Sequence, residues 1–300
     1  MRILIAIVFA LCCVRPAPSQ PDRTLLRALT QTIASYQGKV ALYAVDLKTG
    51  KTIAINADTP VPTASVIKLT VLFEALKQLE SGQVHWDDRL TLQKTDQVIG
   101  SGVLRLFDTP MPLTFKDAVT LMIDLSDNTA TNLVIDHLGL QNIDNRIQWM
   151  GLQNTWLYKK VFQAASGPVP ADQPKFGLGK TTAHEMATVM QRFATCNLAA
   201  AGAPPQPTPE EQSLCNAALG ILKGQFDQND IPRYLSNLQI ANKTGALNDV
   251  RNDVGVVYAP NGPVIISAFT YDNRDQSWTA DNAGQLLIGK LAKAIIQAWN

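Results

Sequence analysis

The pattern of apolar and polar positions divides the chain into strand-forming ends and a helical middle. Residues 23–38 place apolar side chains at helical spacing. Residues 39–56 form two alternating runs joined by a Lys-Thr-Gly turn, which predicts a β-hairpin. Three further alternating segments occur near the C-terminus, at residues 239–247, 252–259 and 263–272. We therefore expect both ends of the chain to contribute strands to one sheet.

The segment between these ends has apolar residues at a helical period. Helical patterns cover residues 65–82, 115–139 and 182–194, and an amphipathic helix closes the chain at residues 283–300. This order predicts an α/β fold of the α+β sandwich type, in which helices flank one antiparallel sheet and an all-helical domain is inserted between the two ends. The expected domains are a sheet domain from residues 23–60 and 225–300 and a helical domain from residues 61–224.

The beginning of the chain has the features of a secretory leader. Arg2 precedes an apolar run of about a dozen residues, which is too short to cross a membrane, and a polar Pro-rich stretch follows. We expect residues 1–20 to be a signal peptide and the protein to be exported to the periplasm or the extracellular space. A buried N-terminal helix is one alternative. Lipidation is another, although Leu11 or Cys12 stands where a small residue should precede the lipidated cysteine.

Composition and charge exclude several classes of function. The net charge is +1 and no basic block occurs, so we expect no nucleic-acid partner. The three histidines lie far apart without a metal-binding spacing, so we expect neither a metal nor another cofactor. Two cysteines follow the leader, Cys196 and Cys215, and either a disulfide or two buried thiols would fit them. We expect a monomer that acts on a small molecule.

The first motif that carries chemistry is Ser65-Val66-Ile67-Lys68. A serine and a lysine three positions apart at the start of a helix lie on one face, where the amine can reach the hydroxyl. Serine needs an adjacent base to act as a nucleophile, and a lysine serves as that base when its pKa is depressed. This predicts Ser65 as the nucleophile and Lys68 as its activator. The alternative is a first-turn serine behind Thr63 as the N-cap.

The second motif is Ser126-Asp127-Asn128, which precedes a predicted helix. Ser126 is expected to pass a proton toward the leaving nitrogen, and the amide of Asn128 to bind a substrate carbonyl. Asp127 is expected mainly to hold the turn. Because all three residue types favour the N-cap position, a helix cap without catalytic function is the alternative.

The third motif is Lys243-Thr244-Gly245, which lies in a predicted strand. Lys243 and Thr244 can hold a substrate carboxylate, and Gly245 would let the substrate backbone approach closely. The same tripeptide occurs at residues 48–50, where it is predicted to form a turn, so the tripeptide alone does not indicate a substrate site.

The three motifs in this order form the signature of the penicillin-recognising serine enzymes. With residues 126–139 and 176–187, they make the sequence similar to the class A β-lactamase family from about Arg23 to the C-terminus. The resemblance implies a β-lactamase/transpeptidase-like fold, an acyl-enzyme on Ser65, and a β-lactam or a peptidoglycan stem peptide as substrate. The backbone N–H groups of Ser65 and Ala246 are expected to hold the oxyanion. Arg251 is expected either to join the carboxylate site or to be a solvated hairpin arginine.

The chain departs from this family in the loop at residues 155–171. Class A β-lactamases carry a glutamate there that deacylates the enzyme through a water, and an asparagine that helps to hold the water. Those places fall at about Val161 and Ala165, and no Asp or Glu occurs from Asn145 to Ala171. Asp172 is the nearest acid but lies beyond the expected position. A general base contributes about 10²–10⁴ in rate, so we expect intact acylation and slow deacylation.

This departure favours a D,D-peptidase-type member of the family over an efficient β-lactamase. After β-lactam attack the leaving nitrogen stays tethered and blocks its side of the ester, whereas the terminal residue of a D-Ala-D-Ala peptide departs and leaves space for water or an amine. The favoured hypothesis is a secreted serine enzyme that acylates with both substrates and hydrolyses β-lactams weakly. A true class A β-lactamase with its deacylating group elsewhere and a non-catalytic binding protein are the alternatives.

Overall fold

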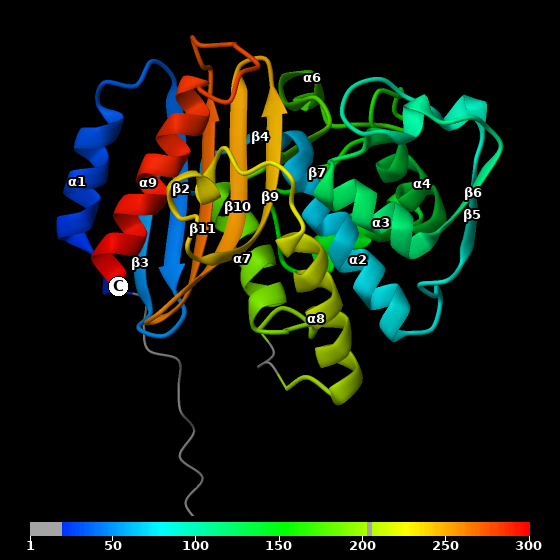
Figure 1. The fold of residues 1–300 in the computed structure, drawn as a ribbon, viewed down its shortest axis with the longest axis horizontal. Helices are drawn as coiled ribbons and strands as arrows, with labels where there is room; N and C mark the ends of the chain where they lie inside the picture. The colour runs from blue at the N-terminus through cyan, green and yellow to red at the C-terminus, as the bar shows by residue number, and fades with distance from the viewer. Residues whose placement is uncertain (1–19, 203–205) are drawn as a thin grey trace, which may run out of the picture.

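The structure, a computed structural model, describes residues 20–202 and 206–300. The predicted leader therefore lies outside the described residues apart from Gln20. A six-stranded sheet crosses the molecule in the order β1 (Gln20–Pro21), β3 (Lys51–Ile55), β2 (Lys39–Asp46), β11 (Gly262–Tyr271), β10 (Val250–Ala259) and β9 (Gln239–Leu247) (Figure 1). All neighbouring strands are antiparallel except β1 and β3. The sheet is built from both chain ends, as the sequence predicts.

Alternate residues of the strands supply two separate cores. On β2, Ala41 belongs to the core on the helical side, whereas Val40 and Leu42 belong to the core on the opposite face. This alternation follows from the two-residue repeat of a strand. Figure 1 shows α1 (Arg23–Ile33) and α9 (Ala283–Trp299) over that opposite face. The sheet is therefore buried on both faces.

The segment between the two ends is mainly helical, as predicted. Its helices are α2 (Lys68–Glu80), α3 (Phe115–Asp124), α4 (Asn128–Leu138), α5 (Leu140–Trp149), α6 (Gln173–Phe176), α7 (Ala183–Ala194) and α8 (Pro209–Lys223), with 3₁₀ turns η1 (Ala64–Ile67), η2 (Lys94–Asp96) and η3 (Leu104–Leu106). A fourth 3₁₀ turn, η4 (Ile231–Tyr234), follows them. Two small sheets that the pattern did not predict also occur, one from β4 (Val61–Pro62), β8 (Gly179–Thr181) and β7 (Trp156–Leu157), the other from β5 (Arg89–Leu92) and β6 (Met111–Thr114).

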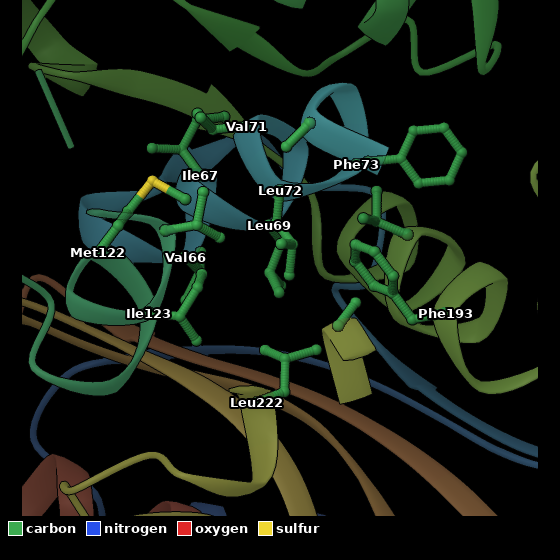
Figure 2. Packing of buried hydrophobic residues seen from close by; sticks show 14 of the residues in the cluster. Val66, Ile67, Leu69, Val71, Leu72, Phe73, Met122, Ile123, Phe193 and Leu222 are labelled. Carbon is green, nitrogen blue, oxygen red and sulfur yellow. The ribbon is translucent and has the colours of Figure 1, made fainter. Parts of the chain in front are cut away.

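Helix α2 lies at the centre of the helical part. Most of its residues are buried, on every side of the helix, and Leu69, Leu72 and Phe73 pack among side chains from α3, α7 and α8 (Figure 2). A helix that is buried all round has little freedom to shift. Its first residue, Lys68, is therefore held rigidly inside the protein.

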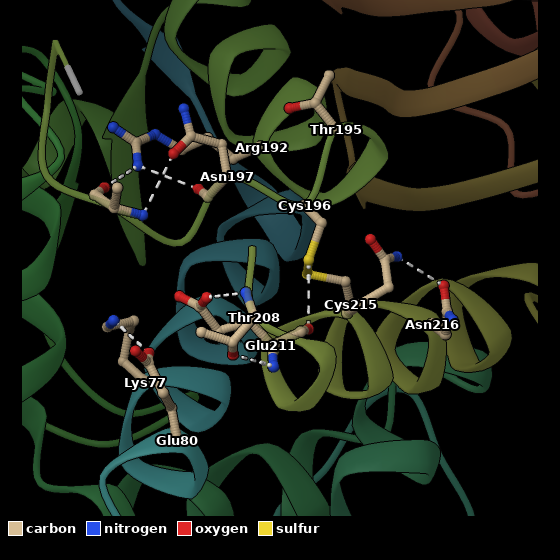
Figure 3. The surroundings of a disulfide bond; sticks show 12 residues. Lys77, Glu80, Arg192, Thr195, Cys196, Asn197, Thr208, Glu211, Cys215 and Asn216 are labelled. Atoms are coloured by element: carbon tan, nitrogen blue, oxygen red, sulfur yellow. Dashed lines mark hydrogen bonds and ion pairs between the residues drawn. A yellow bond between two sulfur atoms is a disulfide. The ribbon is translucent and has the colours of Figure 1, made fainter. Parts of the chain in front are cut away.

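Cys196 and Cys215 form a disulfide (Figure 3). The bond connects the end of α7 to α8 across a sequence separation of 19 residues. The alternative of two buried thiols is therefore wrong. Closing a loop of this length stabilises the fold by about 3 kcal/mol if the effect is entropic.

Among the described residues, no helix has the length and apolar character that a membrane crossing requires. The predicted division into a sheet domain and a helical domain at about residues 60 and 225 stays an interpretation. The core on the helical side contains strand residues such as Val254 and Phe269 together with helix residues, so the two parts share a core.

Candidate active site

A cavity of about 870 Å³ lies where the edge strand β9 meets the helical part. This size suits a small-molecule substrate. The cavity brings the three sequence motifs together. Its lining includes one or more residues of each motif, namely Ser65, Ser126, Asn128, Thr244 and Gly245, and also Ala246 and Arg251. Lys68 and Lys243 are fully buried beside it.

Ser65 lies in the 3₁₀ turn η1, and the α-helix begins only at Lys68. The sequence predicted an α-helix from Ser65, so the start of the α-helix was placed three residues too early. Ser65 and Lys68 still lie on the same face, because residues i and i+3 eclipse each other in a 3₁₀ turn. Ala64 adopts a φ of 45°, an unfavourable conformation for a non-glycine residue. Thr63 precedes the turn but makes no capping hydrogen bond with its side chain.

The amine of Lys68 is held by three oxygen atoms. Its Nζ donates to the carbonyl of Ser126 over 2.8 Å, and lies 3.1 Å from Ser126 Oγ and 3.2 Å from Asn128 Oδ1. Burial, and secondarily the positive charge of Lys243, hold the pKa of Lys68 well below its ordinary value, while Asp127 opposes this shift. These conditions favour the neutral amine that a general base needs. Within the described residues, the side-chain hydrogen bonds of Lys68 go to Ser126 and Asn128 and none goes to Ser65.

Ser126 Oγ lies between the two lysines. It is 3.1 Å from Lys68 Nζ and accepts a hydrogen bond of 3.1 Å from Lys243 Nζ. Lys243 also donates to the carbonyl of Thr244 over 2.8 Å. Burial lowers the pKa of Lys243 to about 8, and Asp253 leads the carboxylates that oppose this fall. A hydroxyl that contacts two amines whose pKa values are lowered is placed to relay a proton.

Asp127 and Asn128 have separate tasks. Asp127 caps α4 by accepting from the N–H of Ala130, and its other carboxylate oxygen accepts from the N–H groups of Val103 and Leu104. Asp127 therefore fixes the turn before α4, as expected, and also the loop that contains Val103 and Leu104. Asn128 donates to the carbonyl of Ile99 over 3.2 Å and lines the cavity.

Gly245 is required for a reason that the sequence did not reveal. A Cβ atom at this position would lie 2.9 Å from the backbone nitrogen of Ser65 and 3.0 Å from both Thr63 O and Val66 N. The close approach is thus to the turn that carries Ser65, which gives the glycine a structural reason besides the predicted approach of a substrate backbone. Since β9 is an edge strand, the adjacent Ala246 lies where the sheet meets the cavity.

Arg251 is 2% exposed, so it is not a solvated hairpin arginine. Its guanidinium donates to the carbonyls of Leu247, Val250 and Ser277 and lies 4.8 Å from the ring centroid of Trp278. Arg251 lines the cavity, but these three carbonyls already bind many of its donors. Its part in holding a carboxylate stays a prediction.

The wall at residues 159–162 contains no carboxylate. Val161 is anchored through its backbone: its N–H donates to Asn132 Oδ1 over 2.8 Å and its carbonyl accepts from Asn132 Nδ2 over 3.0 Å. Asp172 pairs with Lys180 over 2.7 Å and accepts from the hydroxyl of Tyr158. It is not among the residues that line the cavity. Asp172 therefore does not replace the missing acid in this conformation.

Comparison with known proteins agrees with this geometry. The model of the Beta-lactamase enzyme family matches residues 24–299. The chain belongs to the beta-lactamase enzyme family. A curated relative, a beta-lactamase of Amycolatopsis lactamdurans, is 22% identical over 271 residues, 89% of this chain and 83% of that protein.

Two solved structures are similar to this member of the beta-lactamase enzyme family. A beta-lactamase from Sphaerobacter thermophilus DSM 20745 is 28% identical, covers 92% of this chain and 96% of its own, and gives a TM-score of 0.77. PBP-A is 25% identical, covers 95% of this chain and 98% of its own, and gives a TM-score of 0.79. These matches, together with the fold, confirm the predicted family and fold class.

The cavity of this beta-lactamase family member contains acids that the motifs did not indicate. Asp124, Asp227 and Asp249 line it. Burial raises the pKa of Asp124 to about 6, although Lys243 opposes this. Within the described residues, Asp124 Oδ1 is buried without a hydrogen-bond partner. An aspartate two residues before Ser126 belongs to no motif, so no local pattern indicated it.

Exposed aromatic side chains also line the cavity unexpectedly. Phe162, Phe226 and Trp278 are 60%, 76% and 67% exposed. They come from three separate loops, where apolar residues follow no period. Aromatic groups around a concave site are typical of ligand binding.

Proposed function

We propose that this protein is an exported active-site-serine enzyme that forms an acyl-enzyme with β-lactams and with D-Ala-D-Ala peptides, and that hydrolyses β-lactams weakly. The supporting observation is the cavity wall at Val161, where a backbone pairing with Asn132 occupies the place expected for a deacylating carboxylate. Ser65 attacks the carbonyl, Lys68 accepts its proton, and Ser126 with Lys243 returns a proton to the leaving nitrogen.

The edge strand favours a peptide as the natural substrate. In the part of the chain that the structure describes, β9 is the last strand of the sheet, and Thr244, Gly245 and Ala246 line the cavity along its outer edge. An extended peptide can add to such an edge through main-chain hydrogen bonds. The substrate carboxylate would then lie near Lys243 and Thr244, and its scissile carbonyl above Ser65.

The deacylation step separates the two substrate classes. A β-lactam keeps its leaving nitrogen attached, so water has to approach from the side of Val161, where the wall at residues 159–162 offers no carboxylate. A D-Ala-D-Ala peptide loses its terminal residue, and water or an amine can enter the vacated space and use Lys68 again. A missing general base slows a step by about 10²–10⁴-fold.

One observation favours efficient β-lactam hydrolysis as a second candidate function. Asp124 lines the cavity, and its pKa of about 6 makes it a suitable general base near neutral pH. A family member that uses Asp124 for deacylation would be a true class A β-lactamase. A non-catalytic binding protein has less support, because Ser65, Lys68, Ser126 and Lys243 are all present at the cavity.

The experiment follows the covalent adduct of a fluorescent penicillin by mass over time. We expect a long-lived adduct on Ser65 and none in the Ser65→Ala variant. Release of D-alanine from a D-Ala-D-Ala peptide supplies the second readout. Rapid adduct loss that becomes slow in Asp124→Asn would support the second candidate instead. If the parent forms no adduct and does not differ from Ser65→Ala, the proposed function is wrong.

A further inference from the structure

The cavity has two chemically different ends. At one end lie Thr244 and Arg251, close to the buried Lys243. At the other end, a Cβ atom on Gly100 would lie 2.6 Å from Asn128 Nδ2 and 2.9 Å from the ring of Phe162. The Phe162 ring is therefore close to the amide proposed to bind the acyl carbonyl. If the substrate carboxylate lies at the Lys243 end, Phe162 lies at the acyl end.

The backbone around Lys159 is fixed at this acyl end. The N–H of Tyr158 donates to the carbonyl of Leu178 over 3.0 Å on one side. On the other side Val161 forms its two hydrogen bonds with Asn132. Lys159 lines the cavity between these two anchors. A residue held in this way presents its side chain from a defined position.

Lys159 and its neighbour Lys160 differ in their charge partners. Lys160 Nζ binds both carboxylate oxygens of Asp136 over 2.8 Å. Lys159 is half-buried and has no ion pair or hydrogen bond of its side chain within the described residues. The loop itself supplies no acid, because none occurs from residue 145 to residue 171. A partly buried ammonium without a partner favours an anionic ligand.

The acids that line the cavity come from other elements. Asp124 ends α3, Asp227 follows α8, and Asp249 lies in the turn between β9 and β10. Asp124 and Asp227 act electrostatically on Lys243, which places their charges near the carboxylate end. Asp249 lies two residues before Arg251, which lines the carboxylate end of the cavity. The acyl end therefore combines one uncompensated cation with one exposed aromatic ring.

We propose that Lys159 and Phe162 form a subsite for the acyl part of the substrate, in which Lys159 binds a carboxylate and Phe162 packs against the adjoining apolar group. This inference rests on the proposed acyl-enzyme function and adds the class of acyl donor. The favoured donors carry an anionic acyl side chain, such as a peptide whose residue before D-Ala-D-Ala ends in a carboxylate.

Two penicillins that differ by one carboxylate test the subsite. Carbenicillin is benzylpenicillin with a carboxylate on the benzylic carbon, and the second-order acylation constant of each is measured by competition with a fluorescent penicillin. We expect the ratio of carbenicillin to benzylpenicillin acylation to fall about five- to tenfold in Lys159→Gln, since a charge-assisted hydrogen bond is lost. The same ratio should fall toward that of the variant when salt is raised in the parent.

Lys160→Gln is the matched control, because it removes the same charge one residue away. It should leave the ratio within about twofold of the parent, since Lys160 binds Asp136 instead. Phe162→Ala should reduce acylation by benzylpenicillin more than acylation by 6-aminopenicillanic acid, which lacks the acyl side chain. An unchanged ratio in Lys159→Gln, or an equal change in both lysine variants, overturns the subsite alone. Absence of any adduct in the parent overturns the proposed function as well.

Discussion

Replacing Gly245 by alanine tests whether the contact between β9 and the 3₁₀ turn η1, which contains Ser65, sets the reactivity of Ser65. The added Cβ would lie 2.9 Å from Ser65 N and 3.0 Å from Thr63 O and Val66 N. All three atoms belong to the backbone, so no side chain can rotate away. Strand and turn must move apart by roughly half an ångström to reach ordinary van der Waals contact.

This displacement moves the N–H of Ser65 relative to that of Ala246, the two donors proposed to bind the oxyanion. Loss of one such donor costs about 10²–10³-fold in rate, or about 2.7–4 kcal/mol. We expect Gly245→Ala to lower the acylation constant by about 10²-fold or more, and overpacking to lower the free energy of unfolding by about 1–3 kcal/mol. Stopped-flow acylation with a fluorescent penicillin and urea denaturation measure the two effects.

Gly220→Ala is the control. Gly220 is exposed on α8, and a Cβ there would meet nothing within 4 Å. Alanine should stabilise the helix by up to about 1 kcal/mol and leave acylation unchanged. If Gly245→Ala is folded and acylates within about threefold of the parent, the contact does not set the reactivity and the assignment of the oxyanion donors is wrong.

Three further predictions follow from the site and the disulfide. Val161→Glu should shorten the life of a penicillin adduct by about 10²-fold or more, measured by mass, and an unchanged lifetime would show that this wall does not face the ester. Acylation should fall at low pH as Lys68 gains a proton, because its pKa is depressed, and should fall again above about pH 8 as Lys243 loses its charge; an acylation constant that stays flat across pH 8 would contradict this. Replacing Cys196 and Cys215 by serine should lower the free energy of unfolding by about 3 kcal/mol in urea denaturation, and a loss below about 1 kcal/mol would mean that the bridge constrains the unfolded chain little.

The sequence predicted the main sheet for a physical reason, and its motifs indicated Lys68 and Lys243, which are buried beside the cavity and whose catalytic roles stay predictions. Five of the six strands of the main sheet are long enough to show alternation, whereas β1 has two residues. Ser65, Lys68, Ser126 and Lys243 lie in short motifs at the ends of elements or within a strand. The strands of the small sheet around β8 are two or three residues long, too short for a periodic pattern.

Other features depend on tertiary contacts that no local pattern encodes. The short 3₁₀ turn before α2 follows from its packing against β9, where Gly245 allows the close approach. The environment that raises the pKa of Asp124 comes from burial beside a distant segment, since the carboxylate lies close to Gly224. Likewise, Arg251 donates to the carbonyl at the end of β9 and to that of Ser277, 26 residues later in the chain, so its burial was not predictable from its immediate neighbours.

The burial of α2 on every side has a consequence for protein engineering. The helix that begins at Lys68 is also the centre of the larger core, so a substitution that repacks Leu72 or Phe73 would move Lys68 along with the helix. Substitutions intended to raise the stability of the protein should therefore be made first at solvent-facing positions, such as the exposed side of α8. Libraries of variants made to accept new substrates should leave α2 unchanged and vary residues at the rim of the cavity.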